Sequence, residues 1–588
     1  MIVSTSLFAQ TFMRTTLELV RDYGRNEYQG YSLYAWVLDD RHARRRAEKA
    51  LSAWGVSARI RSAYKPLVNF VMEELPTVDL AGVTIKYPEL PDAPRRFLLE
   101  AYPAGALLGD VPVSWEAFSP DDEKTLVYRV AATRSTGAVD HYTVEAPNKT
   151  HKDVIGQPQR SPCGWLRLVS AQGRVTDKAL NTEYEQIYDA AIATLQATDW
   201  KGEPPYFEEL NFSLELPATD TPVDYGHETI SLAEAMHEDL YFSALEFFQK
   251  LAGLPLGDRS LKPGQIVPDI RITDGSEARL HIRLLPLNSR NPKRPRVEQL
   301  ATAPHTLAAQ QISELVAELG GESLHSRSRA GRVVEARYKA GTDRPVMISA
   351  AQHANETSGL VGALRAAQSL AQQEESHFVI SPLENPDGYA VQGRLTETQP
   401  HHMHHAARYT AFGNDLESQP RGGPFEHAIR EQAFQRSGAK LHLNLHGYPA
   451  HEWTRPSTGY IPRGFEMWTI PKGFFLVVRY HSGWRDAAMA LLDQVTQRLS
   501  QVPGLADFNR RLIELFEIHA GELTFPIRHG FPFVASEDNQ QLAPLMLITE
   551  YPDETLTGDA FVQAHTAQMH TVLSAYEVFQ TLALPVGH

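Results

Sequence analysis

The chain has 588 residues, of which 42% are hydrophobic and 22% are charged, and its formal net charge is −15. These values are typical of a globular protein with about two to four domains, and the negative charge argues against a non-specific nucleic-acid binder. A single cysteine, Cys163, excludes a disulfide within the chain and a zinc site of several cysteines, so any metal would need histidines and carboxylates. No secretory signal pattern and no run of about 18 apolar residues occurs, so we expect a cytoplasmic protein without a membrane span.

The first half of the chain is predicted to be a β-rich α+β region. Short alternating runs between turn residues indicate strands from about 60 to 220, with a helix at 180–197. Apolar residues at helical spacing predict a second helix at 231–251. On that helix His237-Glu238-Asp239 cannot all face one metal, because adjacent helical residues point about 100° apart. We therefore expect a surface or interdomain role for these three residues.

A polar, basic segment at 288–296, broken twice by proline, is predicted to be a linker. It divides the chain into a first region, 1–290, and a second region, 297–588. The second region alternates between predicted helices at 306–319 and 359–372 and predicted strands at 345–350 and 377–381. This alternation indicates an α/β fold whose sheet has parallel members.

The first candidate metal ligands are His353 and Glu356, which follow the strand at 345–350 directly and precede a helix. Ligand sites in open α/β sheets form at this end of the strands, and an imidazole with a carboxylate suits Zn²⁺. The alternative is a His-Glu hydrogen bond that caps the helix. The same spacing recurs at His519 and Glu522, where we interpret it as the end of a helix.

The third candidate ligand is His446, at the end of a strand predicted over 441–446. His442 lies on the same face of that strand but deeper, so it is the weaker candidate. His353, Glu356 and His446 form a His₂Glu set that leaves a fourth position for water, as in catalytic zinc sites. The sequence therefore predicts one zinc ion as cofactor.

The candidate general base is Glu550, at the predicted end of the apolar strand 545–550. A buried, unpaired carboxylate is costly, so a Glu at this place is expected to have a function. Next to a water at the open zinc position, it could take the proton of the water and pass it to the leaving amine. The alternative is a salt-bridged Glu at the edge of the sheet.

In this order, the motifs resemble those of the zinc carboxypeptidases of the carboxypeptidase A type. The resemblance covers 297–588 and includes the Asn-Pro-Asp-Gly segment 385–388, itself a strong turn signal, and Thr549-Glu550. It implies a mixed central sheet of about eight strands flanked by helices. It also implies that His353, Glu356 and His446 are the zinc ligands and that Glu550 is the catalytic glutamate.

The resemblance places Arg408 at the position of the arginine that stabilises the oxyanion. The Asn-Arg pair that holds the terminal carboxylate of the substrate in this family is replaced here by Glu417-Ser418, which cannot form a two-point clamp. Arg394 or Arg421 could supply a displaced clamp. Alternatively, Glu417 could attract an amine or another cation.

A histidine tract, His401-His402-Met403-His404-His405, precedes Arg408. We interpret it as a polar loop at the entrance of the cleft, with a second metal site as the alternative.

Three functions remain open. A metallo-exopeptidase that removes C-terminal residues fits the motifs most fully, and a deacylase-type amidohydrolase acting on an N-acyl amino acid is favoured by the altered clamp. The third is a zinc-free binding protein with an inactive site. The expected substrate is thus a peptide or an acylated amino acid. The sequence indicates neither the oligomeric state nor the role of the first region.

Overall fold

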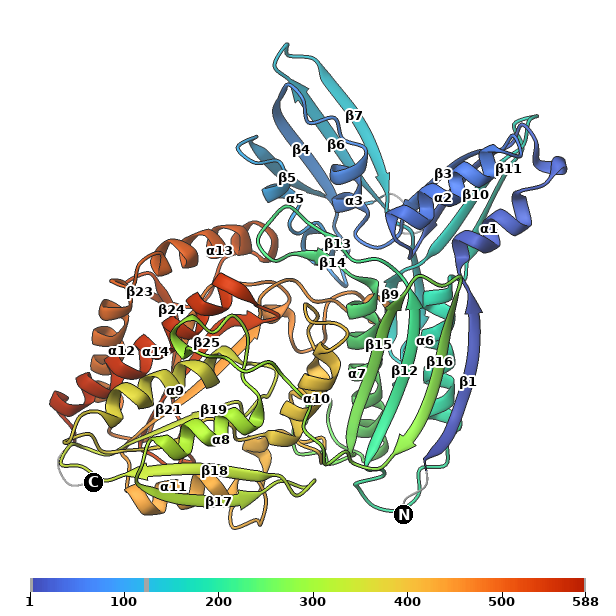
Figure 1. The fold of residues 1–588 in the computed structure, drawn as a ribbon. Coiled ribbons are helices and arrows are strands. Elements are labelled where there is room, and N and C mark those ends of the chain that lie inside the picture. The colour runs from blue at the N-terminus through green and yellow to red at the C-terminus, as the bar shows by residue number, and fades with distance from the viewer. Residues whose placement is uncertain (1–3, 121–125, 586–588) are drawn as a thin grey trace.

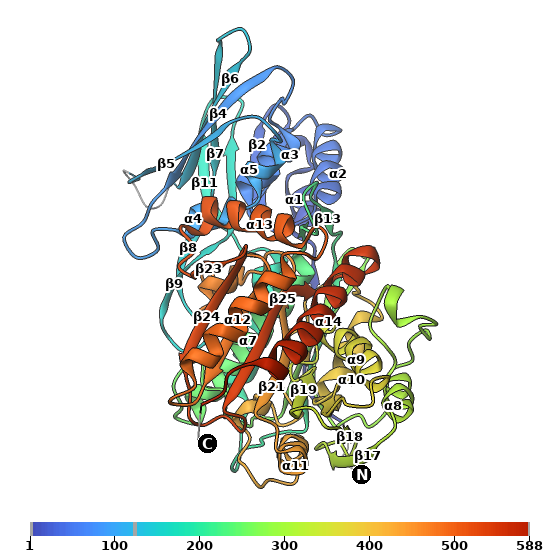
Figure 2. The ribbon, with the colours of Figure 1, turned by 90° about the vertical axis from the view of Figure 1, so that its left-hand side faces the viewer.

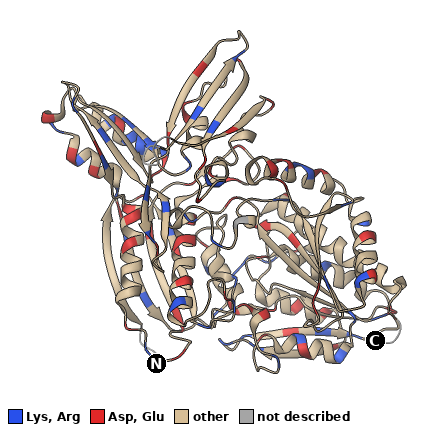
Figure 3. Cartoon of the chain, turned by 180° about the vertical axis from the view of Figure 1, so that it is seen from behind, with Lys and Arg blue, Asp and Glu red and all other residues tan. Residues whose placement is uncertain are grey.

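The structure is a computed structural model that describes residues 4–120 and 126–585. Among the described residues, the first region forms three small β-rich units, and the second region forms one large mixed sheet with helices (Figure 1). The predicted α/β class is therefore confirmed. No helix within the described ranges is both long and apolar enough to cross a membrane. Acidic and basic residues are interspersed along both regions of the chain (Figure 3).

The first unit is a four-stranded sheet of order β11-β10-β2-β3 with two helices beside it. Its elements are α1 (Thr15–Tyr23), η1 (Asn26–Tyr28), β2 (Ser32–Val37), α2 (Arg41–Ser52), β3 (Ser57–Ser62), β10 (Gly164–Val169) and β11 (Val175–Leu180). Helix α2 begins at Asp40, whose carboxylate accepts a hydrogen bond from Ala43 N at 2.9 Å. On this basic helix Arg44 is buried and pairs with Glu73 at 2.5 Å.

The second unit is a four-stranded sheet of order β5-β4-β6-β7, with the hairpin β8-β9 below it. Its elements are α3 (Pro66–Glu73), β4 (Leu80–Pro88), α4 (Arg96–Glu100), α5 (Ala104–Leu107), β5 (Val113–Phe118), β6 (Val127–Arg134), β7 (Val139–Glu145), β8 (Asn148–Lys152) and β9 (Pro158–Pro162). Alternating apolar residues of β4 and β6 pack on α3, as the two-residue period of these strands predicts.

The third unit is a sheet of order β1-β16-β12-β15 that packs against two long helices, α6 and α7. Its elements are β1 (Thr5–Met13), α6 (Glu183–Ala197), β12 (Glu209–Pro217), β13 (Thr221–Pro222), β14 (Thr229–Ile230), α7 (Leu232–Leu251), β15 (Gln265–Thr273) and β16 (Glu277–Leu285). A capping box between Thr182 and Glu185 starts α6, and the Ser231 hydroxyl accepts from Glu234 N at 3.1 Å to start α7.

The second region contains a nine-stranded mixed sheet of order β17-β18-β20-β19-β21-β25-β22-β24-β23. Its strands are β17 (Glu322–Arg327), β18 (Val333–Lys339), β19 (Val346–Ala350), β20 (Phe378–Ser381), β21 (Leu441–Pro449), β22 (Phe475–Tyr480), β23 (Ile527–Arg528), β24 (Phe531–Glu537) and β25 (Leu545–Glu554). Its helices are η2 (Leu300–Thr302), α8 (Ala309–Glu318), α9 (Ser358–Ala371), α10 (Pro386–Thr396), η3 (His405–Ala407), η4 (Leu416–Ser418), α11 (Ala428–Ser437), η5 (Pro456–Thr458), η6 (Glu466–Trp468), α12 (Arg485–Leu499), α13 (Leu505–Ala520) and α14 (Gly558–Thr581).

One face of the central strands packs against α9, α12 and α14 (Figure 2). Alternate residues of β21, β25 and β22 form this apolar core: Leu441, Leu443, Leu445, Leu545, Leu547, Tyr551, Leu476, Val478 and Tyr480. Because successive side chains of a strand point to opposite faces, the residues between them point to the other side. That second face, which we call the cleft face, carries the candidate site.

Within the described residues the mixed sheet has nine strands, in line with the expected sheet of about eight. Two sequence predictions about local structure need correction. Strands β21 and β25 do not end at His446 and Glu550, because their parallel pairing continues to Pro449 and Glu554. The Asn-Pro-Asp-Gly segment begins a helix instead of forming an isolated turn. Asn385 caps α10 by accepting from Gly388 N at 2.9 Å, and Pro386 occupies the first helical position, where its missing N–H costs nothing.

One of the hydrophobic clusters contains residues of both regions. Trp453 of the second region stacks on Phe242 of α7, with ring centroids 5.4 Å apart. Buried ion pairs surround this contact and join Arg455 to Glu246 at 2.7 Å and Lys65 to Glu452. The first region is therefore packed against the loop that follows β21, next to the strand that carries His446.

Candidate active site

The loop between β19 and α9 brings His353 and Glu356 to the end of the central sheet. The residue after β19, Ala351, adopts a left-handed conformation with φ of 50°, and Glu356 N donates to His353 O at 3.2 Å. This tight turn lets both side chains face the same point. The Ser358 N–H that opens α9 donates to the buried Asp553 carboxylate at 2.7 Å, which fixes the far end of the loop.

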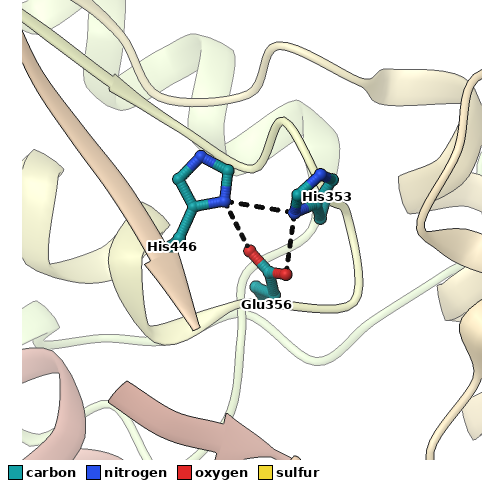
Figure 4. Close-up of side chains that lie close together, drawn as sticks. All are labelled: His353, Glu356 and His446. Carbon is teal, nitrogen blue, oxygen red and sulfur yellow. Dashed lines mark hydrogen bonds and ion pairs between the residues drawn. The ribbon is translucent and has the colours of Figure 1, made fainter. Parts of the chain in front are cut away.

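His446 lies on the cleft face of the adjacent strand β21 and completes a buried group with this pair (Figure 4). Its Nδ1 lies 3.0 Å from Glu356 Oε2 and 3.1 Å from His353 Nδ1, while His353 Nδ1 lies 2.8 Å from Glu356 Oε1. One ligand atom from each of the three residues lies within 4.8 Å of the other two. His442 is outside this group and hydrogen-bonds to Ser349 at 2.7 Å.

The donor set fits a metal cation. Each Nδ1 faces both the other Nδ1 and a carboxylate oxygen, and one ring nitrogen carries at most one proton, so protons alone cannot satisfy all these contacts. A cation at the centre of the three atoms would satisfy them together. Two imidazole nitrogens and one carboxylate oxygen are the ligand types of catalytic zinc sites.

Burial favours the ligating form of one of the three residues, and the neighbouring imidazoles favour that of a second. Burial lowers the pKa of His446 and so favours its neutral imidazole. Burial alone would raise the pKa of Glu356, but the two adjoining imidazoles outweigh it and hold the pKa well below its usual range. Metal ligands must be deprotonated, so both shifts suit metal binding.

Asp415 supports His353 from behind. Its Oδ2 lies 3.4 Å from His353 Nε2, and its Oδ1 accepts from Gln352 Nε2 at 2.9 Å and from Glu417 N at 3.1 Å. A carboxylate on the second ring nitrogen orients a metal-binding histidine and makes it more basic. Sequence reasoning missed this role, although a buried Asp in the segment after Arg408 was available as a signal.

Glu550 and Arg408 lie with the two histidines around one cavity of about 270 Å³. Glu550 is the Cα partner of His446 across the β21–β25 pair. Burial, and then the Glu356 carboxylate, raise the pKa of Glu550 well above its usual value. Arg408 follows η3 and donates to Glu356 Oε1 at 2.8 Å.

Both regions contribute to the wall of the cavity. Its lining residues are Arg259, Gln352, His353, His405, Arg408, Asp415, Glu417, Asn444, His446, Gly447, Tyr448, Pro449, Trp453, Phe465, Trp468, Phe475, Val477, Arg479, Phe525, Val534, Met546, Ile548 and Glu550. Arg259 comes from the loop between α7 and β15, and its guanidinium lies 3.6 Å from Asp415. Sequence reasoning could not place Arg259, because it is far from the motifs along the chain.

The structure does not bring Arg394 or Arg421 to this cavity. Arg394 forms an ion pair with the buried Glu209 of β12 at 3.0 Å, so its guanidinium is held by the first region. Arg421 donates to the Gln540 carbonyl and lines a neighbouring cavity. Glu417 does line the site, but Arg430 donates to it at 2.6 Å and neutralises its charge.

The histidine tract lies at the boundary between the two regions, and its last residue, His405, also lines the cavity. His405 pairs with Glu238 of α7 at 2.6 Å, and His402 pairs with Asp220 at 2.6 Å. His404 is also buried and contacts the Gln399 carbonyl at 2.9 Å. The carboxylates that pair with His405 and His402 belong to the first region, which explains why a polar tract can be buried. The interdomain alternative for 237–239 thus agrees with the structure.

The second His-Glu spacing behaves as predicted, since His519 lies in the last turn of α13. It is buried, and its Nδ1 contacts the Leu98 carbonyl of the first region at 2.9 Å.

The sequence matches no protein-family model and no curated protein. Several solved structures are similar to part of the chain. A metallo-carboxypeptidase from Pseudomonas aeruginosa, in complex with (2-guanidinoethylmercapto)succinic acid, is 16% identical, with 53% of this chain and 74% of that chain covered and a TM-score of 0.30. A metallo-carboxypeptidase from Burkholderia cenocepacia is 13% identical, with 52% and 73% covered and a TM-score of 0.28. The ectoine utilization protein EutE from Ruegeria pomeroyi, in a product-bound structure, is 12% identical, with 46% and 69% covered and a TM-score of 0.25.

Proposed function

We propose that the chain is a zinc-dependent metallopeptidase that hydrolyses a peptide or amide bond as a carboxypeptidase does. The observation that carries this proposal is the convergence of His353, Glu356 and His446, with Glu550 and Arg408 on the same cavity. A zinc ion held by the three ligands would supply a Lewis acid that polarises a carbonyl and activates water. The remaining steps belong to side chains of this chain.

Glu550 serves as the general base. A carboxylate with a raised pKa is a stronger base than an ordinary glutamate, and Glu550 lines the same cavity as His353 and His446. It takes one proton from the attacking water as the new C–O bond forms. It then gives that proton to the amine nitrogen as the C–N bond breaks, so the carboxylate is regenerated after each cycle.

Arg408 stabilises the negative charge that develops on the carbonyl oxygen. Its guanidinium is already oriented by the 2.8 Å hydrogen bond to Glu356, so little reorganisation is needed during the reaction. Burial would lower the pKa of Arg408, but the Glu356 carboxylate outweighs it and raises the pKa, so the side chain stays charged.

Arg259 is the residue we propose as a replacement for the altered carboxylate clamp. It lines the cavity, its side chain is 50% exposed, and the 3.6 Å contact with Asp415 leaves donors for a substrate carboxylate.

A deacylase-type amidohydrolase acting on an N-acyl amino acid is the second candidate, because Glu417-Ser418 does not match the peptidase clamp.

The proposal is tested by elemental analysis of protein purified without chelators, followed by two substrate panels. The panels are N-blocked dipeptides with a free C-terminus and N-acyl amino acids. We expect one zinc per chain and zinc-dependent hydrolysis of the dipeptides. The variant His446→Ala should lose zinc, while His325→Ala, at an exposed histidine of β17, should retain it. Protein without zinc would refute both candidates, and release from N-acyl amino acids alone would favour the deacylase.

A further inference from the structure

The cavity extends away from Glu550 along the cleft face of three paired strands. On β25 the cleft-face residues are Glu550, Ile548 and Met546, since Leu545, Leu547 and Tyr551 belong to the core on the opposite face. The pairing of β25 with β22 places Phe475 opposite Glu550, Val477 opposite Ile548, and Arg479 opposite Met546. These six residues all line the cavity, so the strand register gives the order in which the three pairs follow one another away from Glu550.

The middle of this pocket is apolar and its far end is basic. Val534 of β24 is the Cα partner of Val477 and extends the apolar wall beside Ile548. One step deeper, Arg479 has a side chain that is 36% exposed, and its ion pair with Asp538 is 3.8 Å long. An ion pair of this length leaves guanidinium donors available to a ligand.

We propose that this pocket selects a C-terminal residue with a carboxylate side chain, glutamate or aspartate, and that Arg479 is the residue that determines this specificity. The inference rests on the proposed carboxypeptidase function and names its substrate class. An apolar side chain in the pocket would remove water from Arg479 without giving it a hydrogen-bond partner, since its contact with Asp538 is 3.8 Å long, and such desolvation is costly. A carboxylate side chain would form charge-assisted, two-point hydrogen bonds with the guanidinium.

Distance along the strands assigns Arg479 to the side chain rather than to the terminal carboxylate of the substrate. Met546, opposite Arg479, lies four residue steps from Glu550, which corresponds to about 13 Å of strand. The terminal carboxylate lies within one residue of the scissile bond, a span of about 3.8 Å. It therefore remains near Glu550, and only the side chain of the last residue extends toward Arg479.

The acidic residue of the pocket does not favour a cationic side chain instead. Glu417 accepts a hydrogen bond from Arg430 at 2.6 Å, and Arg430 is itself buried against Glu384. Burial alone would raise the pKa of Glu417, but Arg430 outweighs it and lowers the pKa, so this carboxylate is ionised and already paired. At the deep end the charged group that lines the cavity is thus Arg479, while Asp538, 3.8 Å from it, lies outside the lining.

The test compares kcat/KM for N-blocked dipeptides that differ only in the last residue: Glu, Asp, Gln, Leu and Arg. We expect the Glu peptide to exceed the Gln peptide by ~10²-fold or more, because a site built for a polar group rejects analogues that lack it. Arg479→Leu should remove this preference and favour the Leu peptide. The control Arg528→Leu changes an arginine of β23 with the same 36% side-chain exposure, outside the cavity lining, and should keep the preference.

A binding measurement separates this inference from the proposed function. Metal-free protein is titrated calorimetrically with N-acetylglutamate and with N-acetylglutamine, which have nearly the same shape but differ in charge. We expect at least tenfold tighter binding of N-acetylglutamate, reduced in Arg479→Leu and unchanged in Arg528→Leu. Failure of every peptide to be cleaved, with this binding preference intact, would refute only the hydrolase. Equal binding of the two ligands, or binding of neither, would overturn the inference.

Discussion

Glu550 is the Cα partner of His446 across a parallel strand pair, so the candidate base and a candidate metal ligand are fixed by one backbone register. Neighbouring strands lie about 4.8 Å apart, so their spacing varies little when other parts of the protein move. The adjacent contact between Glu356 and His446 links the same register to the loop after β19.

Replacing Glu550 with Gln is expected to retain zinc but to lower kcat by ~10²–10⁴-fold, because the amide cannot accept the proton of water. In the wild-type protein, kcat/KM should fall on the acidic side of the pH profile, with a midpoint above the pKa of an ordinary glutamate. The reason is that burial and Glu356 raise the pKa of Glu550. Stopped assays from pH 5 to 9 and elemental analysis measure both effects. Loss of zinc in the variant would show that Glu550 is a ligand instead.

Replacing Arg408 with Ala should lower kcat more than it raises KM, by ~10²–10³-fold, because the charge it stabilises develops only in the transition state. Arg408 also donates to the ligand Glu356, so zinc content must be measured beside the rate. An unchanged kcat in the zinc-loaded variant would remove Arg408 from the mechanism.

Replacing Asp415 with Asn should weaken zinc binding by ~10–100-fold, because His353 loses the carboxylate that orients its ring. Competition with a fluorescent chelator measures this affinity directly. As a control, Asp538→Asn alters a carboxylate outside the metal group and should leave the zinc affinity as in the wild type. Equal zinc affinity in Asp415→Asn and wild-type protein would contradict the assignment.

Replacing Arg259 with Leu should raise KM for peptides with a free C-terminus by about tenfold, a modest value because the side chain is half exposed. KM for C-terminally amidated peptides, where these are cleaved, should not change. The control Arg271→Leu removes an arginine of the first region with 52% side-chain exposure that pairs with Asp269. A similar rise in KM in both variants would point to a general electrostatic effect.

The contact between His451 and Glu234 should make stability depend on pH at the boundary of the two regions. Burial alone would lower the pKa of His451, but Glu234, 2.7 Å away, outweighs it and raises the pKa to about 9. Because this folded-state pKa exceeds the unfolded value of about 6.5, the stabilisation is complete below pH ~6.5 and is lost as the pH rises through 9. The melting temperature of His451→Gln should therefore lie furthest below that of the wild type at pH 6 and approach it above pH 9. A difference independent of pH would contradict the ion pair.

The sequence was informative where function depends on short segments. The spacing of His353 and Glu356 after an apolar strand, and the alternation in β21, were enough to predict the metal group as a hypothesis. The extent of β21 and β25 was not predictable, because the pairing of Pro449 with Glu554 depends on the partner strand and not on local hydrophobicity.

Contacts between distant segments could not be predicted. The histidine tract is polar, and a polar tract is normally exposed. Here His405 is instead paired with Glu238, which lies 167 residues earlier in the chain. Arg259 reaches the cavity by the same kind of long-range packing. Arg394 and Arg421 were plausible by proximity in sequence to Arg408, yet Glu209 and the Gln540 carbonyl bind them elsewhere.

The division of β21, β25 and β22 into a core face and a cleft face has an evolutionary consequence. Exchange of Val477, Arg479 or Met546 would alter which substrates fit without changing Leu476, Val478 or Leu547, which stabilise the fold. New specificities could then arise by single substitutions on an unchanged scaffold. An insertion of one residue in the same strands would instead exchange the two faces, so we expect relatives to differ here by substitution and not by length.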